Sequence, residues 1–160
     1  MPTSDSSLQR MASAAATGQT QPDELCRQMT TYVHRKMHRS AFSTTLQTAD
    51  QIAASLQGDC TEHAVLLATL MRIRGIPARV ASGLIYTNQQ YGFVGHMWVE
   101  AQINDTWIPF DSTVAPESSG VIRIRLADSD LPDSMTSGVS LFLPVMELAG
   151  RSKVRFISSE

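Results

Sequence analysis

The stretch "GDCTEHAVLL", residues 58–67, places a cysteine directly before an apolar helical run. Asp59 is suited to be a helix N-cap, and Glu62 follows it at the spacing of a capping box. Cys60 would therefore lie in the first helical turn, where unpaired backbone N–H groups and the helix dipole favour thiolate over thiol. The same N–H groups can stabilise an oxyanion. From position alone, a nucleophile and a small core residue are equally good interpretations of Cys60.

Apolar residues at helical spacing continue beyond this stretch to Ile73 and surround the helix, which predicts a central core helix ending at Gly75. Two helices are predicted upstream. One spans about 22–39, with acids in its first turn and basic residues at its end. The other spans 48–57, begins with a capping box and stops at Gly58. Residues 1–21 are rich in Ser, Ala, Thr and Gln, so we expect a mobile tail there and a domain over 22–160.

The hydrophobic period changes from helical to alternating after Pro77. This pattern predicts strands at 78–86, 96–103 and 106–111, with a polar loop over 86–95 and a tight hairpin turn at Asn104-Asp105. Further strands are expected at 121–127 and 153–157. The apolar stretch 139–148 contains a proline and receives no assignment. Helices followed by strands, without a repeat or a second domain, predict an α+β fold.

The predicted hairpin brings an imidazole beside a carboxylate. With a two-residue turn, Trp98 faces Asp111 across the hairpin, and His96 lies two residues earlier on the same face. His96 and Asp111 are then diagonal neighbours within side-chain reach. Such a carboxylate fixes the tautomer of the imidazole and stabilises imidazolium, as in a catalytic triad. A three-residue turn would separate the two side chains, and a polar strand rim is the competing interpretation.

The other three histidines allow different roles. His34 and His38 are expected near a helix C-terminus, where a solvated imidazolium is favourable. His63 lies three residues after Cys60 on the same helix, so a base, a second metal ligand and a surface residue are all open interpretations. A metal site made of Cys60, His63 and His96 would keep one open position.

Composition excludes several classes of protein. The chain has 160 residues, 42% of them hydrophobic and 18% charged, with a net charge of −2. This describes an ordinary globular domain without the basic field that nucleic acid or a membrane surface would favour. The apolar runs are too short to span a bilayer, and no signal peptide is visible. A cytoplasmic location is the default unless the sequence is a fragment of a longer exported protein, and the oligomeric state is not predicted. Two free thiols are favoured over a Cys26–Cys60 disulfide.

Taken together, four motifs resemble the transglutaminase-like superfamily of papain-like cysteine enzymes. That family shows Gly-Asp-Cys opening a helix, a Gly-Ile-Pro-Ala-Arg exit into a strand, a His-x-Trp-Val-Glu strand and a Trp-x-x-x-Asp strand. Each motif is present here in this order, at residues 58–60, 75–79, 96–100 and 107–111. The match covers about residues 49–113, and "VIRIRLADSDL" at 121–131 resembles the closing strand region more weakly.

The resemblance implies a transglutaminase-core fold, with N-terminal helices and a central nucleophile helix packed on an antiparallel sheet. It implies that Cys60 is the nucleophile, His96 the general acid/base and Asp111 its orienting group. Many members have Asp-Pro-Thr where this chain has Asp-Ser-Thr at 111–113, which leaves the acid in place. The family also uses an oxyanion donor upstream of the cysteine. The candidates are the backbone N–H of Cys60 and the side chains of Gln47, Gln51 and Gln57.

The implied activity is acyl transfer through a thioester on a protein or peptide substrate. Cys60 would attack a carboxamide or peptide carbonyl, and either water or an amine would then accept the acyl group. Hydrolysis by a protease or amidase is favoured over transglutamination. Trp98 is expected to be a core residue or to line the substrate cleft. No cofactor, metal or calcium site is expected. The alternative is an inactive peptide-binding domain with the same fold, against which the intact Cys, His and Asp argue.

Overall fold

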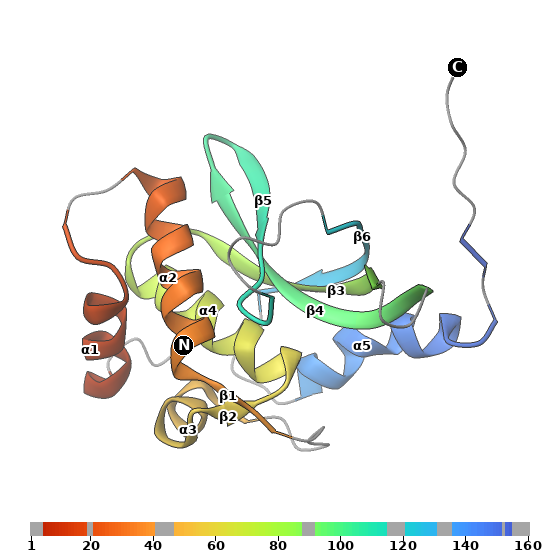
Figure 1. The fold of residues 1–160 in the computed structure, drawn as a ribbon, viewed down its shortest axis with the longest axis horizontal. Helices are drawn as coiled ribbons and strands as arrows, with labels where there is room; N and C mark the ends of the chain where they lie inside the picture. Colours follow the sequence, from red (N-terminus) through yellow and green to blue (C-terminus); the bar gives the residue numbers. More distant parts are fainter. Residues whose placement is uncertain are drawn as a thin grey trace.

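The protein, seen here as a computed structural model, has the predicted α+β architecture (Figure 1). The structure describes residues 5–18, 21–40, 47–87, 92–114, 121–130, 136–151 and 153–154. Its helices are α1 (Ser6–Ala15), α2 (Pro22–Lys36), α3 (Ala49–Ser55), α4 (Cys60–Ile73) and α5 (Thr136–Leu148). Its strands are β1 (His38–Arg39), β2 (Gln57–Gly58), β3 (Ala78–Thr87), β4 (Gly92–Ile103), β5 (Thr106–Phe110) and β6 (Arg123–Ser129).

The main sheet is antiparallel, with the strand order β5-β4-β3-β6. Asn104 and Asp105 both have left-handed φ angles, 50° and 60°, as the tight turn between β4 and β5 requires. Val99 pairs with Phe110, which confirms the predicted two-residue turn and register. The predicted loop over 86–95 is wrong at residues 86–87 and 92–95, which belong to β3 and β4, two strands that pair with each other there. The rest of the predicted loop, 88–91, lies outside the described residues.

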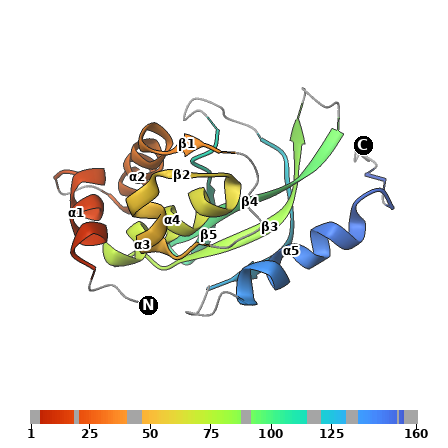
Figure 2. The same cartoon turned by 90° about the horizontal axis from the view of Figure 1, so that it is seen from below.

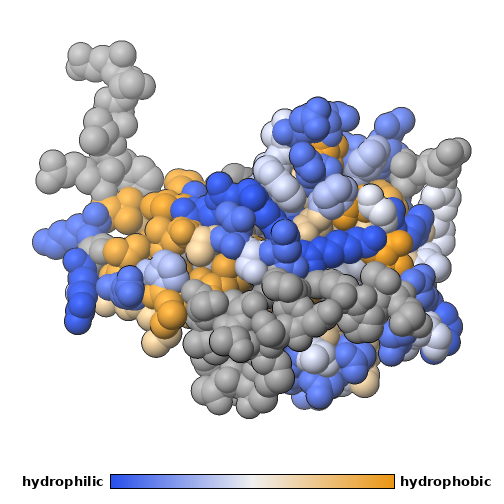
Figure 3. All heavy atoms as spheres, turned by 180° about the vertical axis from the view of Figure 1, so that it is seen from behind, coloured by the Kyte–Doolittle hydropathy of each residue, from blue (hydrophilic) through white to orange (hydrophobic). Residues whose placement is uncertain are grey.

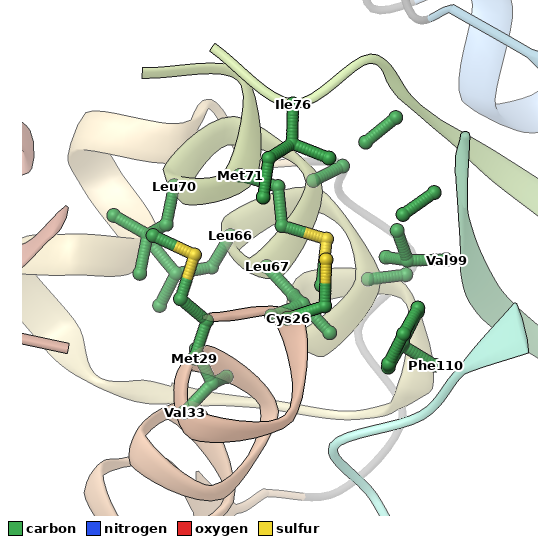
Figure 4. Close-up of a cluster of buried hydrophobic side chains, with 14 of the residues drawn as sticks. Cys26, Met29, Val33, Leu66, Leu67, Leu70, Met71, Ile76, Val99 and Phe110 are labelled. Atoms are coloured by element: carbon green, nitrogen blue, oxygen red, sulfur yellow. The ribbon is translucent and has the colours of Figure 1, made fainter. Parts of the chain in front are cut away.

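Helix α4 is the centre of the core, as its apolar pattern predicts. Leu66, Leu67, Leu70 and Met71 are fully buried. In Figure 4 these side chains lie between α2, which contributes residues such as Met29, and the sheet. Packing α4 against both layers removes apolar surface from water on nearly every side of the helix, which stabilises its position in the fold.

Cys26 belongs to this core rather than to a disulfide. Its side chain has no solvent exposure and lies among the buried residues of α2 and α4 (Figure 4). Burial, together with the charge of Asp23, raises the pKa of the Cys26 thiol to about 12. Both cysteines are free, as expected.

The N-terminal region differs from the expected mobile tail, because residues 6–15 form α1. Asp5 caps this helix and accepts hydrogen bonds from the backbone N–H groups of Ser7 at 2.7 Å and Leu8 at 3.2 Å. Leu8, Ala12 and Ala15 are buried and recur at i, i+4 and i+7. Figure 2 shows α1 beside α2, α3 and α4. The stripe consists mostly of small alanines, so residues 1–21 contain few large apolar side chains, although the spacing of the stripe is helical.

The chain between α3 and α4 also differs in one detail from the prediction. Thr48 and Gln51 form the predicted capping box of α3. The helix does not end at Gly58, however, since the left-handed residue at its C-terminus is Leu56, with φ 51°. Gly58 instead lies in β2, which pairs in parallel with β1. Because β1 follows α2 and β2 precedes α4, this pairing places the end of α2 near the start of α4.

The unassigned stretch 139–148 lies in α5, which tolerates Pro144 inside it. Gly95 of β4 lies against Phe142 and Val145 of α5. Met97 and Val99 alternate with Gly95 on β4 and join the core around α4, so α4 and α5 lie on one face of the sheet. Leu143 and Met146 are exposed, and Figure 3 shows apolar side chains at this end of the molecule.

The predicted strand at 121–127 is confirmed as β6, which begins at Arg123. The strand expected at 153–157 lies mostly outside the described residues. Within the described part of the chain, no helix is both long enough and apolar enough to cross a membrane.

Candidate active site

The local sequence places Cys60 at the first residue of α4. Asp59 is the N-cap and accepts a hydrogen bond from the backbone N–H of Thr61 at 2.8 Å. The Glu62 carboxylate in turn accepts from the backbone N–H of Asp59 at 2.9 Å, so the predicted capping box is present. Cys60 is partly exposed and free. Its thiol thus combines solvent access with a position at the positive end of a helix dipole.

The hairpin brings His96 to Asp111, as the register predicts. The Nε2 atom of His96 lies 2.8 Å from Oδ2 of Asp111, and both residues are buried, each with 7% of its surface exposed. The paired residues of β4 and β5 end at Phe110, so Asp111 begins the turn that follows β5. The diagonal contact therefore forms where the ladder stops, which leaves the carboxylate free to turn toward the imidazole.

His96 joins Asp111 to Cys60. Burial by itself lowers the pKa of His96, but the hydrogen bonds and charges of Asp111 and Cys60 outweigh burial and raise the pKa to about 9. Asp111 contributes more to this rise than Cys60 does. The imidazole is accordingly a stable cation at neutral pH while it contacts both a carboxylate and a sulfur.

Asp111 has further partners that sequence reasoning missed. Its Oδ1 atom accepts hydrogen bonds from the backbone N–H of Thr113 at 3.0 Å and from the Thr113 hydroxyl at 2.6 Å. Arg123 of β6 places Nη2 3.5 Å from Oδ2. Burial raises the pKa of Asp111, yet the bond and charge of His96 and the bonds of Thr113 lower it to about 2. Thr113 could have been found from its i+2 spacing after an acid, whereas Arg123 is distant in sequence.

Ser112 is held by two histidines from two helices. The Nδ1 atom of His63 lies 3.1 Å from the Ser112 hydroxyl, and Nδ1 of His34 lies 2.9 Å from the Ser112 carbonyl oxygen. His63 is buried, so its interpretation as a surface residue is wrong. The pKa of His63 is lowered to about 4. Burial is the main cause, the charge of Asp111 opposes it, and the charges of His34 and Arg39 add to the lowering. His34 is half-buried, whereas His38 is exposed as expected.

Other candidate residues lie elsewhere. Trp98 has 1% of its surface exposed and packs with Ala81 and Ile85, which agrees with the core interpretation of this residue. The Gln51 side chain is occupied by its capping box, where it accepts from the backbone N–H of Thr48. Gln57 is exposed on β2, and Gln47 is half-buried. Among the described residues, no group of three or more His, Cys, Asp and Glu side chains could hold a metal ion, which argues against the Cys60–His63–His96 metal site.

The fold and this geometry agree with what the chain resembles. A model of the transglutaminase-like superfamily matches residues 9–112. The match begins within α1, in the region where a mobile tail was expected, and ends just after Asp111. The chain belongs to the transglutaminase-like superfamily. No curated protein matches it in sequence.

Three solved structures are similar to the chain. A candidate cysteine protease from Cytophaga hutchinsonii is 26% identical, with a TM-score of 0.59 over 74% of this chain and 40% of that one. A protein described as a TGase is 16% identical, with a TM-score of 0.54 over 68% and 31%. A candidate protease from Parabacteroides distasonis is 15% identical, with a TM-score of 0.51 over 65% and 22%. This chain thus spans less than half the length of each of these structures.

Proposed function

We propose that Cys60, His96 and Asp111 form a catalytic triad for acyl transfer through a thioester. The observation that carries the proposal is the position of His96 between a buried carboxylate 2.8 Å away and the partly exposed thiol at the start of α4. A cation held between a carboxylate and a thiol stabilises the thiolate, which is the reactive form of cysteine. The likeness to the Cytophaga hutchinsonii structure supports a cysteine-dependent reaction.

Each residue has one role in the proposed reaction. The Cys60 thiolate attacks the carbonyl carbon of a peptide or glutamine-type amide, and the oxyanion that forms is stabilised at the N-terminus of α4, where the backbone N–H of Cys60 is the proposed donor. His96 protonates the departing amine or ammonia. Because Asp111 contacts Nε2, the nitrogen that serves the thiol is Nδ1. His96 then deprotonates a water or an amine, which attacks the thioester and releases Cys60.

We favour water over an amine as the acyl acceptor, so the proposed enzyme is a protease or amidase acting on a protein or peptide. The competing function is an inactive domain that binds peptides. Burying an imidazole and a carboxylate has a desolvation cost. A catalytic site requires such a buried pair, whereas a surface that only binds peptides does not. The buried pair therefore favours the enzyme.

The first experiment identifies the reaction. A peptide with a glutamine donor is incubated with the protein, with and without a primary amine, and the products are identified by mass spectrometry. We expect a deamidated or cleaved peptide, which Cys60→Ala abolishes and Asp111→Asn reduces roughly 10²–10⁴-fold. An amine adduct as the main product would instead make the protein a transferase.

The second experiment tests the nucleophile without a substrate. Iodoacetamide should alkylate Cys60 near pH 6, where a free thiol with a pKa of about 8.5 reacts slowly. Cys26 provides an internal control, because its buried thiol with a pKa of about 12 should stay unlabelled in the folded protein. If Cys60 reacts no faster than a free thiol and wild type is as inert as Cys60→Ala, the binding domain becomes the better description.

A further inference from the structure

The turn that begins at Asp111 is held at its second residue, Ser112, by contacts to two helices. The last paired residue of β5 is Phe110, opposite Val99, and the chain leaves the ladder at Asp111. Beyond this pair no strand pairing holds the backbone in the described residues of the turn, so the contacts of Ser112 help to set the path of the turn. The neighbouring residue Ser112 is 2% exposed and contacts two histidines, although nothing in the proposed reaction uses them.

The two contacts restrain different parts of Ser112. His34 of α2 contacts the main-chain carbonyl oxygen at 2.9 Å, which restrains the path of the backbone. Because a carbonyl oxygen only accepts hydrogen bonds, Nδ1 of His34 carries the proton of this bond. His63 of α4 contacts the side-chain hydroxyl at 3.1 Å, which restrains the rotation of the turn. Together they restrain the residue bonded directly to Asp111.

His63 lies on the same helix as Cys60, one turn further along. Its bond to Ser112 therefore joins the helix that carries the thiol to the turn that carries the carboxylate. This contact restrains the position of the turn that carries the carboxylate relative to the helix that carries the thiol. Proton transfer between positioned groups is sensitive to displacements of about 1 Å, so such a link has a direct effect on catalysis.

We infer that His63 and His34 are positioning residues, which hold Ser112 so that the Asp111 carboxylate stays against His96. The inference rests on the proposed function, since it assigns the two histidines a part in the same site. Neither histidine is expected to touch the substrate. His63 is suited to this part because it is buried and stays neutral at neutral pH, its pKa being lowered to about 4 mainly by burial.

Asparagine and glutamine distinguish this role from simple packing. An asparagine side chain places a polar atom near the position of histidine Nδ1, whereas glutamine places one near Nε2. Both Ser112 contacts use Nδ1, and Nε2 of His63 has no hydrogen-bond partner among the described residues. His63→Asn should therefore keep the link and His63→Gln should break it, although both replace a buried ring by a smaller amide. His34→Asn and His34→Gln form a second pair at a half-buried site, where folding is less at risk.

The readout is the titration of His96 in protein labelled with ¹⁵N-histidine, followed by NMR, with His96→Asn to assign the signal. In wild type we expect a pKa of about 9. In Ser112→Ala, His63→Gln and His34→Gln we expect this pKa to fall toward the ordinary value of 6.5. We expect alkylation of Cys60 at pH 7 to slow roughly fivefold, the effect of one lost hydrogen bond. The exposed His38 supplies control variants, since His38→Asn and His38→Gln should match wild type.

The outcomes separate the inference from the proposed function. Wild-type values in both asparagine variants, with a lowered His96 pKa in both glutamine variants and in Ser112→Ala, would support the positioning role of His63 and His34. Equal behaviour of asparagine and glutamine at both positions, or an unchanged His96 titration in Ser112→Ala, would overturn it. The proposed function fails separately, if wild-type Cys60 reacts like a free thiol. The His96 titration reports the positioning role of His63 and His34 whether or not Cys60 is reactive.

Discussion

Gly58 determines how closely the chain before the nucleophile can approach helix α4. A Cβ atom at this position would lie 2.3 Å from the Cβ of Glu62 and 2.7 Å from its Cγ. The carboxylate of Glu62 accepts a hydrogen bond from the backbone N–H of Asp59. Because Gly58 has no side chain, Glu62 has the space to form this bond and complete the capping box that begins the helix at Cys60. Glycine at this position is needed for close approach rather than for a left-handed backbone.

Gly58→Ala should destabilise the protein by on the order of 2 kcal/mol, because the added methyl group must displace Glu62 in a packed region. It should also slow alkylation of Cys60, since the first turn of α4 shifts with its cap. Urea unfolding and iodoacetamide labelling measure the two effects.

Gly75→Ala is the matched control for this substitution. Gly75 has φ 77° and open space around its missing Cβ, so alanine there should cost about 1 kcal/mol through backbone strain alone. It should leave Cys60 reactivity unchanged. Equal reactivity of Cys60 in the two variants would contradict the account of Gly58.

At the scale of elements, α1 and the β4–β5 hairpin differ in how much of each could be predicted. The hairpin register follows from a two-residue turn, which local backbone geometry favours at Asn104-Asp105. The docking of α1 depends on α4, since Arg74 donates through Nη1 to the carbonyl oxygens of Ala12 at 3.0 Å and Ala16 at 2.9 Å. These bonds pair the C-terminal carbonyls of α1, which its own sequence cannot do.

Leu8→Ala tests whether α1 is a structural part of the domain. Leu8 has no exposed surface, so removing its side chain should lower the free energy of unfolding by roughly 2–4 kcal/mol. Ser13→Ala changes an exposed position on the same helix and should stay within about 0.5 kcal/mol of wild type. Urea unfolding of both variants is the measurement, and equal stability of the two would mean that residues 6–15 are not docked in solution.

At the scale of the whole molecule, two buried histidines make stability depend on pH in opposite directions. His96 has a pKa of about 9, raised from 6.5, so its stabilising effect is complete below pH 6.5 and is lost as the pH rises through 9. His63 has a pKa of about 4, lowered from 6.5, so the folded protein loses stability as the pH falls from 6.5 to 4, where only the unfolded chain takes up the proton.

We therefore expect the free energy of unfolding to be greatest near pH 6.5. Each shift of about two and a half units corresponds to on the order of 3 kcal/mol on its side of the maximum. Urea titrations at pH 4.5, 6.5 and 9 measure the profile. His63→Asn should flatten the acid side, and Asp111→Asn should flatten the alkaline side. A profile that rises steadily from pH 4.5 to 9 would contradict the assignment to His96, and one that falls steadily over this range would contradict the assignment to His63.

The sequence by itself determined the capped start of α4 at Cys60 and the register that brings His96 to Asp111. Both depend on hydrogen bonds and dihedral angles within a few residues, which spacing alone specifies. Only the tertiary structure decided that Ser112 lies between His34 and His63, that Arg123 approaches Asp111, that Trp98 is buried and that α1 docks on α4. These contacts join distant segments, so they depend on how the helices pack on the sheet, where burial outweighs local preference.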